Sequence, residues 1–157
     1  MGKLAIGDPY QGGIVAHLGR SGQHSLIAAT HDLDGGTGIR WYKGEYTVTG
    51  ATATALGTGA SNTAKIIASQ GSPATSYAAG LAAACTDGGF NDWHLPSLDE
   101  LDKLFLSKGK VGGFAPANYW SSSERDECTA WYQHFRVGAQ HGDFKYEQYR
   151  VRAVRRF

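Results

Sequence analysis

Residues 91–101 read Asn-Asp-Trp-His-Leu-Pro-Ser-Leu-Asp-Glu-Leu, and this segment carries the strongest structural signal in the chain. Its second half is a capping box, in which the Ser97 hydroxyl and the Glu100 carboxylate each satisfy a backbone donor at the start of a helix. Lys108, just before Gly109, suits the negative end of that helix. The apolar face of the predicted helix consists of Leu101, Leu104 and Phe105.

Short β signals separated by turns flank this helix on both sides. Upstream, apolar and β-branched runs predict strands at 13–17, 25–29 and 46–49. Downstream, alternating apolar and polar residues predict strands at 130–137 and 149–157. The order along the chain is therefore β, then α, then β.

Two further helix signals lie between these β regions. A helix beginning at Thr63 can be capped by Ser61 or Asn62, and a second helix can be capped by Ser76 and bury Cys85. The apolar face predicted for the first consists of Ala64, Ile67 and Ala68, and that of the second of Tyr77, Leu81, Ala84 and Cys85. Together the signals predict an α+β fold with short helices packed on antiparallel sheet.

Length and composition exclude several classes of protein. With 157 residues, 41% hydrophobic and 18% charged, the chain is expected to form one domain over residues 1–157 and not to be disordered. A net charge of +1 does not suggest a dedicated nucleic-acid binder, and no run of about 18 apolar residues predicts membrane insertion. Cys85 and Cys128 are compatible with one disulfide or with two free thiols.

The sequence contains no complete motif for catalysis, metal binding or cofactor binding. The six histidines show no HExxH or HxH spacing, and residues 32–36 lack the ligands of an EF-hand and are expected to form a turn. Ser121–Ser123 lacks the nucleophile elbow, and Gly57–Gly59 lacks the lysine of a phosphate-binding loop. We therefore expect no enzyme activity, no metal and no cofactor, unless a constellation forms that the sequence order conceals.

The last thirteen residues are basic. From Lys145 to Phe157, five basic residues face one acid, Glu147, which leaves a local excess of +4. Arginine pairs bidentately with sulfate, phosphate or carboxylate, so this cluster suits a polyanionic ligand. The alternative is that these arginines pair with neighbouring acids or keep an outward strand face solvated.

The ordered pieces of the chain resemble the Lcl C-terminal domain family, named for a bacterial collagen-like adhesin. The pieces are NDWHLPSLDEL (91–101), GGF (112–114), YWSSSE (119–124), AWY (130–132) and RVRAVR (150–155). N-terminal segments also resemble the fuller members, so the resemblance covers nearly the whole chain. It implies a C-type-lectin-like α+β domain in which Trp93, Trp120 and Trp131 fill the core.

The resemblance also implies a non-enzymatic domain that is secreted or displayed on the bacterial surface. Such a domain binds sulfated glycosaminoglycans or other anionic glycans, assembles as a homotrimer on a collagen-like stalk, and supports adhesion, autoaggregation and biofilm formation. The residues expected to contact the glycan are Lys103, Lys108, Lys110, Tyr132, His134, Arg136, Lys145, Tyr146, Arg150 and Arg152.

Two other functions fit the same sequence. The domain could be the receptor-binding tip of a phage or a retroelement-diversified protein, in which Tyr132 and Tyr146 contact a protein or an uncharged glycan. It could also be a trimerisation cap that sets the register of a fibrous stalk and has no ligand of its own.

Overall fold

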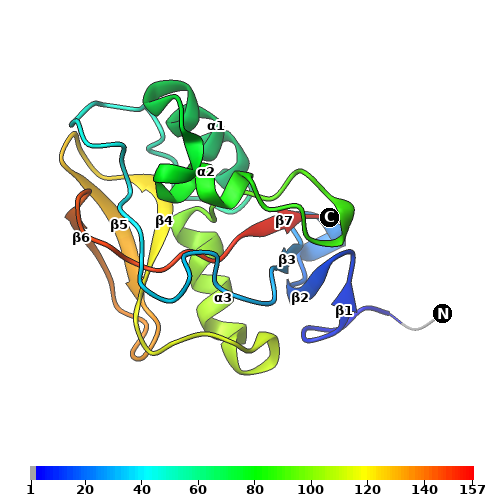
Figure 1. Cartoon of the computed structure of the whole chain (residues 1–157). Helices are drawn as coiled ribbons and strands as arrows, with labels where there is room; N and C mark the ends of the chain where they lie inside the picture. The colour runs from blue at the N-terminus through cyan, green and yellow to red at the C-terminus, as the bar shows by residue number, and fades with distance from the viewer. Residues whose placement is uncertain (1–2) are drawn as a thin grey trace.

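Two antiparallel sheets enclose a central helix in the computed structural model, which describes residues 3–157 (Figure 1). The first sheet has the order β1-β2-β3-β7 and joins the two ends of the chain, since Ile27 pairs with Arg155. Its strands are β1 (Pro9–Tyr10), β2 (Gly13–His17), β3 (Leu26–Ala28) and β7 (Val154–Arg156). The predicted α+β class is confirmed.

The second sheet is a three-stranded meander. It consists of β4 (Asn118–Glu124), β5 (Thr129–His134) and β6 (Gln140–Phe144), in that order. Trp120 pairs with Tyr132, and Tyr132 pairs with His141, so these three side chains share one face of the sheet.

The central helix is α3 (Leu98–Val111), and it begins where the capping box predicted. Glu100 Oε1 accepts a hydrogen bond from the Ser97 backbone N–H at 2.9 Å, while Ser97 Oγ accepts one from the Glu100 N–H at 3.4 Å. Leu101 and Leu104 are fully buried, as expected for the core face. The helix continues past Gly109 and ends at Gly112, whose φ of 83° takes the chain out of the helical conformation.

The predicted starts and faces of the two other helices need correction. Helix α1 (Gly59–Gln70) begins four residues before Thr63 and buries Asn62 and Ile66, whereas Ala64 and Ala68 are exposed. Asn62 caps nothing, because its Nδ2 donates to the Ala53 carbonyl at 2.7 Å. Short 3-10 turns occupy Arg20–Gly22, Ala74–Ser76 and Asp87–Gly89.

Helix α2 (Ala78–Ala83) is shorter than the sequence suggested. Ser76 does not cap it, because the Ser76 hydroxyl donates to the Pro73 carbonyl at 2.7 Å inside the preceding turn. Tyr77 and Cys85 are buried as predicted, but Ala84 is exposed.

One predicted strand is absent, and another is shorter than predicted. Residues 46–49 form no strand, because their backbone is held by side chains: the Thr47 carbonyl accepts from Lys145 Nζ, and the Thr49 N–H donates to Glu124. In the segment 149–157 only β7 is a strand, and Tyr149 and Arg150 form isolated bridges to Ile39 and Tyr119.

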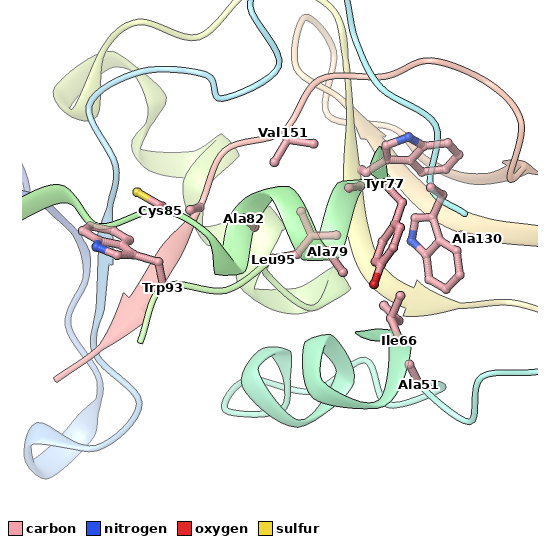
Figure 2. Packing of buried hydrophobic residues seen from close by; sticks show 14 of the residues in the cluster. Ala51, Ile66, Tyr77, Ala79, Ala82, Cys85, Trp93, Leu95, Ala130 and Val151 are labelled. Carbon is pink, nitrogen blue, oxygen red and sulfur yellow. The ribbon is translucent and has the colours of Figure 1, made fainter. Parts of the chain in front are cut away.

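The larger hydrophobic cluster lies between α1, α2 and the sheets (Figure 2). Trp93 and Trp120 are buried there as predicted, and so is Trp41, whereas Trp131 is only half-buried. Each buried indole is satisfied by a backbone carbonyl, as in the 2.8 Å bond from Trp41 Nε1 to Ser121. Cys85, also in this cluster, is a free thiol.

Candidate ligand-binding surface

Lys145 lies inside the molecule and not on its surface. Its side chain is 1% exposed, and Nζ donates to Glu124 Oε2 at 2.7 Å and to the Thr47 carbonyl at 3.0 Å. The ammonium also lies 4.8 Å from the centroid of the Trp41 ring. This burial corrects the prediction that Lys145 contacts a ligand.

Arg152 is the second predicted contact that is buried. Its Nε donates to Asp32 Oδ1 at 2.9 Å. Its terminal nitrogens donate to three backbone carbonyls, those of Ala29, Gly112 and Gly113, at 2.7 to 3.1 Å. A guanidinium with this many partners is a structural charge, so the prediction of ligand contact by Arg152 is also corrected.

Most of the basic side chains of the C-terminal segment are therefore buried or paired with acids inside the fold. Arg155 is also buried and pairs with Asp92 at 2.7 Å, which lowers the pKa of the Asp92 carboxyl. Arg156 is the member of this cluster that is exposed. The alternative reading of the sequence, in which the terminal arginines pair with neighbouring acids, holds for Arg152 and Arg155.

A shallow pocket brings together His134 and Arg150. Its volume is about 310 Å³, and it lies between the glycine turn 36–38, the edge of β4 and the segment 148–150. His134 Nδ1 accepts from the Arg136 N–H at 3.1 Å. Arg150 Nη1 lies 3.6 Å from Asp32 Oδ2, so one nitrogen of its guanidinium is already paired with a carboxylate.

The turn beside this pocket forms as predicted. Asp34 Oδ2 accepts hydrogen bonds from the backbone N–H groups of Gly36 and Gly38, at 3.2 and 2.7 Å. Its other oxygen accepts from the Val151 N–H at 3.1 Å, which ties the turn to the C-terminal segment. The carboxylate therefore organises backbone, as expected of a short acidic residue beside glycine.

Tyr132 belongs to an aromatic group on the face of the second sheet that it shares with buried Trp120. Its ring packs against those of Tyr149 and His141, with centroid distances of 4.9 and 6.1 Å. The Tyr149 hydroxyl donates a short hydrogen bond to Asp143. Burial and this carboxylate raise the pKa of Tyr149, so its hydroxyl stays protonated as a donor.

The four remaining predicted cations lie on α3 and on the connection that follows β5. Lys103 and Lys110 line a pocket of about 330 Å³ together with Leu106. Lys108 Nζ donates to the carbonyl of Phe135 at 2.5 Å, which places it beside Arg136 on the connection from β5 to β6. We call these residues the basic end: Lys103, Lys108, Lys110 and Arg136.

None of these four cations forms an ion pair within residues 3–157. Lys103 is close enough to His17 that its charge, after the effect of burial, lowers the pKa of that imidazole. The basic end therefore presents positive charge that the folded chain does not neutralise.

Tyr146 stands apart from the basic end. It is 49% exposed and stacks on Phe144, with ring centroids 5.2 Å apart and planes at 5°. Phe144 was not expected at the site, although its position two residues from Tyr146 in an alternating segment could have indicated a shared face.

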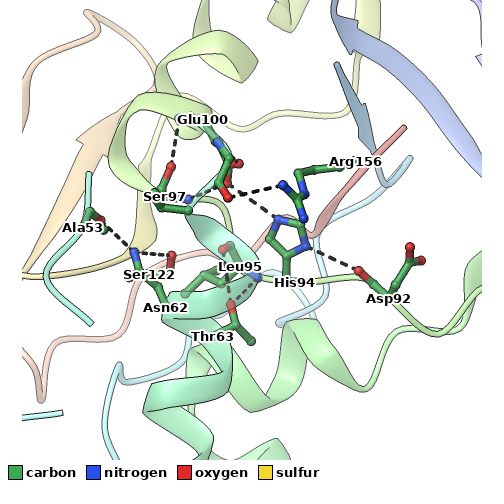
Figure 3. Close-up of polar contacts among 12 residues, drawn as sticks. Ala53, Asn62, Thr63, Asp92, His94, Leu95, Ser97, Glu100, Ser122 and Arg156 are labelled. Carbon is green, nitrogen blue, oxygen red and sulfur yellow. Dashed lines mark hydrogen bonds and ion pairs between the residues drawn. The ribbon is translucent and has the colours of Figure 1, made fainter. Parts of the chain in front are cut away.

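A buried pair of a histidine and a glutamate lies at the start of α3 (Figure 3). His94 Nε2 lies 3.6 Å from Glu100 Oε1, and both side chains are at most 4% exposed. Burial disfavours the Glu100 carboxylate, but contacts from His94, Ser97 and Gly57 outweigh it and lower the pKa of Glu100. The pair thus completes a helix cap.

The described residues lack two features that would bear on function. Within residues 3–157, no three side chains of His, Cys, Asp or Glu converge as a metal site requires. In the same range, no helix has the length and apolar character needed to cross a bilayer.

A family model matches most of the chain. The family model described as the Lcl C-terminal domain matches residues 32–155, which is nearly the whole chain. No curated protein matches the sequence.

Proposed function

The chain belongs to the Lcl C-terminal domain family, and on that premise we propose that it is a non-enzymatic adhesin domain of the bacterial surface that binds sulfated glycosaminoglycans or another anionic glycan. Such binding supports adhesion, autoaggregation and biofilm formation. The C-type-lectin-like architecture and a homotrimer on a collagen-like stalk are parts of the same proposal.

The observation that carries this proposal is the unpaired charge of the basic end. Buried Lys145 and Arg152 have acidic partners at 2.7 and 2.9 Å, whereas the four cations of the basic end have none within residues 3–157. Fixed, unneutralised cations attract a polyanion because binding releases its condensed counterions. The charge available for a glycan is therefore mainly on α3 and the β5–β6 connection, because Lys145, Arg152 and Arg155 of the C-terminal segment are buried and paired and, among the basic residues of 145–157, only Arg156 is exposed.

Helix chemistry alone does not explain this cluster. Lys108 and Lys110 lie in the last turn of α3, where cations stabilise the negative end of the helix. Arg136 lies on the connection after β5, outside α3, so the helix dipole does not explain its position. Its exposure beside Lys108 is what extends the charge from one helix end to a surface.

The test is titration with heparin, with hyaluronan as the unsulfated comparison, at several salt concentrations. We expect Lys108→Gln, Lys110→Gln and Arg136→Gln combined to weaken heparin binding by at least tenfold and to flatten its salt dependence. The matched control replaces three exposed cations elsewhere, Arg40→Gln, Lys43→Gln and Lys65→Gln. Equal losses in both triple variants, or heparin binding unchanged at about 0.5 M salt, would contradict the proposal.

Light scattering tests the oligomeric part of the proposal separately. A trimer whose mass increases with heparin supports the adhesin function. A trimer whose mass does not change with heparin at physiological salt favours the trimerisation cap. A monomer contradicts assembly on a triple-helical stalk.

A further inference from the structure

Three exposed aromatic residues lie on the side of the molecule where β6 ends. Tyr46, Phe144 and Tyr146 are 38%, 46% and 49% exposed, and we call them the aromatic face. Large aromatic side chains are costly to leave in water, so a group of them marks a contact surface more often than a lone one does. The stacked, nearly parallel rings of Phe144 and Tyr146 make its flat centre.

The fold holds the two segments of this face together from beneath. Lys145, between Phe144 and Tyr146 in sequence, points inward and donates to the carbonyl of Thr47, the residue after Tyr46. The same ammonium is fixed by Glu124, whose carboxylate also accepts from the Thr49 N–H at 3.0 and 3.1 Å. The buried ion pair therefore preorganises the aromatic face.

The hydrogen bond from Lys145 to the Thr47 carbonyl brings Tyr46 to the same side of the molecule as Phe144 and Tyr146. Partial burial, and then the neighbouring Tyr42, Cys128 and Tyr146 groups, raise the pKa of Tyr46. Tyr46 also packs against Tyr42 with a centroid distance of 5.3 Å. Tyr46 and Tyr146, a hundred positions apart in the sequence, thus contribute to the same surface.

A polar pocket of about 420 Å³ lies along the segment that carries Tyr46, because Glu45 and Thr47 line the pocket although Tyr46 itself does not. Hydrogen bonds fix its walls: Gln70 Oε1 accepts from the Lys43 N–H at 2.9 Å, and Gln70 Nε2 donates to Thr47 Oγ1 at 2.9 Å. Its two charged residues, Lys43 and Glu45, are opposite in sign. The pocket offers donors and acceptors without an excess of either charge.

We propose that the aromatic face and this pocket form a second glycan site, which binds the pyranose rings of an uncharged oligosaccharide. The C–H face of a pyranose is apolar and flat, so it can cover an aromatic ring, while its hydroxyls need the hydrogen-bonding groups that the pocket provides. This site does not depend on the basic end, because it carries no cation excess and lies on other elements.

The test is calorimetric titration with cellohexaose, maltohexaose and chitohexaose at 0.15 and 1 M NaCl. We expect at least one of them to bind with an affinity that changes less than twofold with salt, since the hexaoses carry no charge for salt to screen. Tyr146→Ala and Phe144→Ala should each weaken that binding by about tenfold. The matched control is Leu106→Ala, which removes an exposed apolar side chain from α3.

Two outcomes overturn this proposal. One is the absence of binding by all three hexaoses to a protein whose thermal midpoint shows it to be folded. The other is self-association that Tyr146→Ala abolishes, which would assign the aromatic face to a second copy of the chain. The charge-neutralised Lys108, Lys110 and Arg136 variant must bind the hexaose normally, so failure here is distinct from failure of heparin binding.

Discussion

Lys145 Nζ and Glu124 Oε2 lie 2.7 Å apart, and each side chain is 1% exposed. The ammonium and the carboxylate both hold the segment 47–49, which forms no strand of its own. This ion pair thus fixes the backbone of residues 47–49, as hydrogen bonds between strands fix the backbone elsewhere in the fold. It therefore also fixes the loop that contains Tyr46.

Lys145→Met should destabilise the protein strongly, because it leaves the Glu124 carboxylate buried without its counter-charge. We expect the free energy of unfolding to fall by about 3–5 kcal/mol, measured by urea denaturation. Lys43→Met, at an exposed position, is the control and should change it by less than about 0.5 kcal/mol. A loss below about 1 kcal/mol for Lys145→Met would show that the pair is not structural.

Two helical glycines should respond to alanine with opposite signs. A Cβ at Gly109 in α3 meets no atom within 4 Å, so Gly109→Ala should stabilise the protein by about 0.5–1 kcal/mol through helix propensity. A Cβ at Gly80 in α2 would lie 1.8 Å from the Ala74 carbonyl oxygen, so Gly80→Ala should destabilise it. The change in unfolding free energy of each variant is measured by thermal and urea denaturation. A change of the same sign in both variants would contradict the packing described.

Glu100 should make stability depend on pH in the acid range. Its pKa is lowered in the folded state, so its contribution is complete above its unfolded pKa of about 4.3 and is lost as pH falls through the folded value. We expect Glu100→Gln to cost about 2 kcal/mol at pH 7, because it removes a charged acceptor of two backbone N–H groups.

The informative measurement is the difference between the wild-type and Glu100→Gln unfolding free energies from pH 7 to pH 2. That difference should shrink as the wild-type carboxylate is protonated. Asp92 and Asp126 also have lowered pKa values and contribute to both proteins, so they cancel in the difference. A difference independent of pH would mean that Glu100 charge is irrelevant to the cap.

Arg152→Lys should be far from conservative. Lysine keeps the charge but cannot reproduce the planar fork that reaches Asp32 and three carbonyls. We expect a loss of about 2–4 kcal/mol in unfolding free energy, and little effect from Arg156→Lys at an exposed position four residues further on, in β7. Retained stability with lost heparin binding would instead restore Arg152 to the ligand surface.

The elements that the sequence predicted well depend on local chemistry. The capping box at Ser97 and Glu100 uses atoms three residues apart, and the Asp34 turn uses atoms two and four residues apart, so both could be recognised without knowing the fold. Helix α1 was placed less well, because Asn62 looks like a cap but instead donates to Ala53. A side chain with two possible partners is assigned only by packing.

For the candidate site, the sequence and the tertiary structure determined different properties. Residue types and their order were enough for the α+β class, for the family and for an excess of cations near the C-terminus. Which cations face solvent was decided only by folding, because Asp32, Asp92 and Glu124 are distant in sequence from the bases that they neutralise. A count of charges along the sequence does not show which charges meet in space. Lys145 and Arg152 therefore lie in the interior, whereas the cations at the end of α3 remain unpaired within residues 3–157.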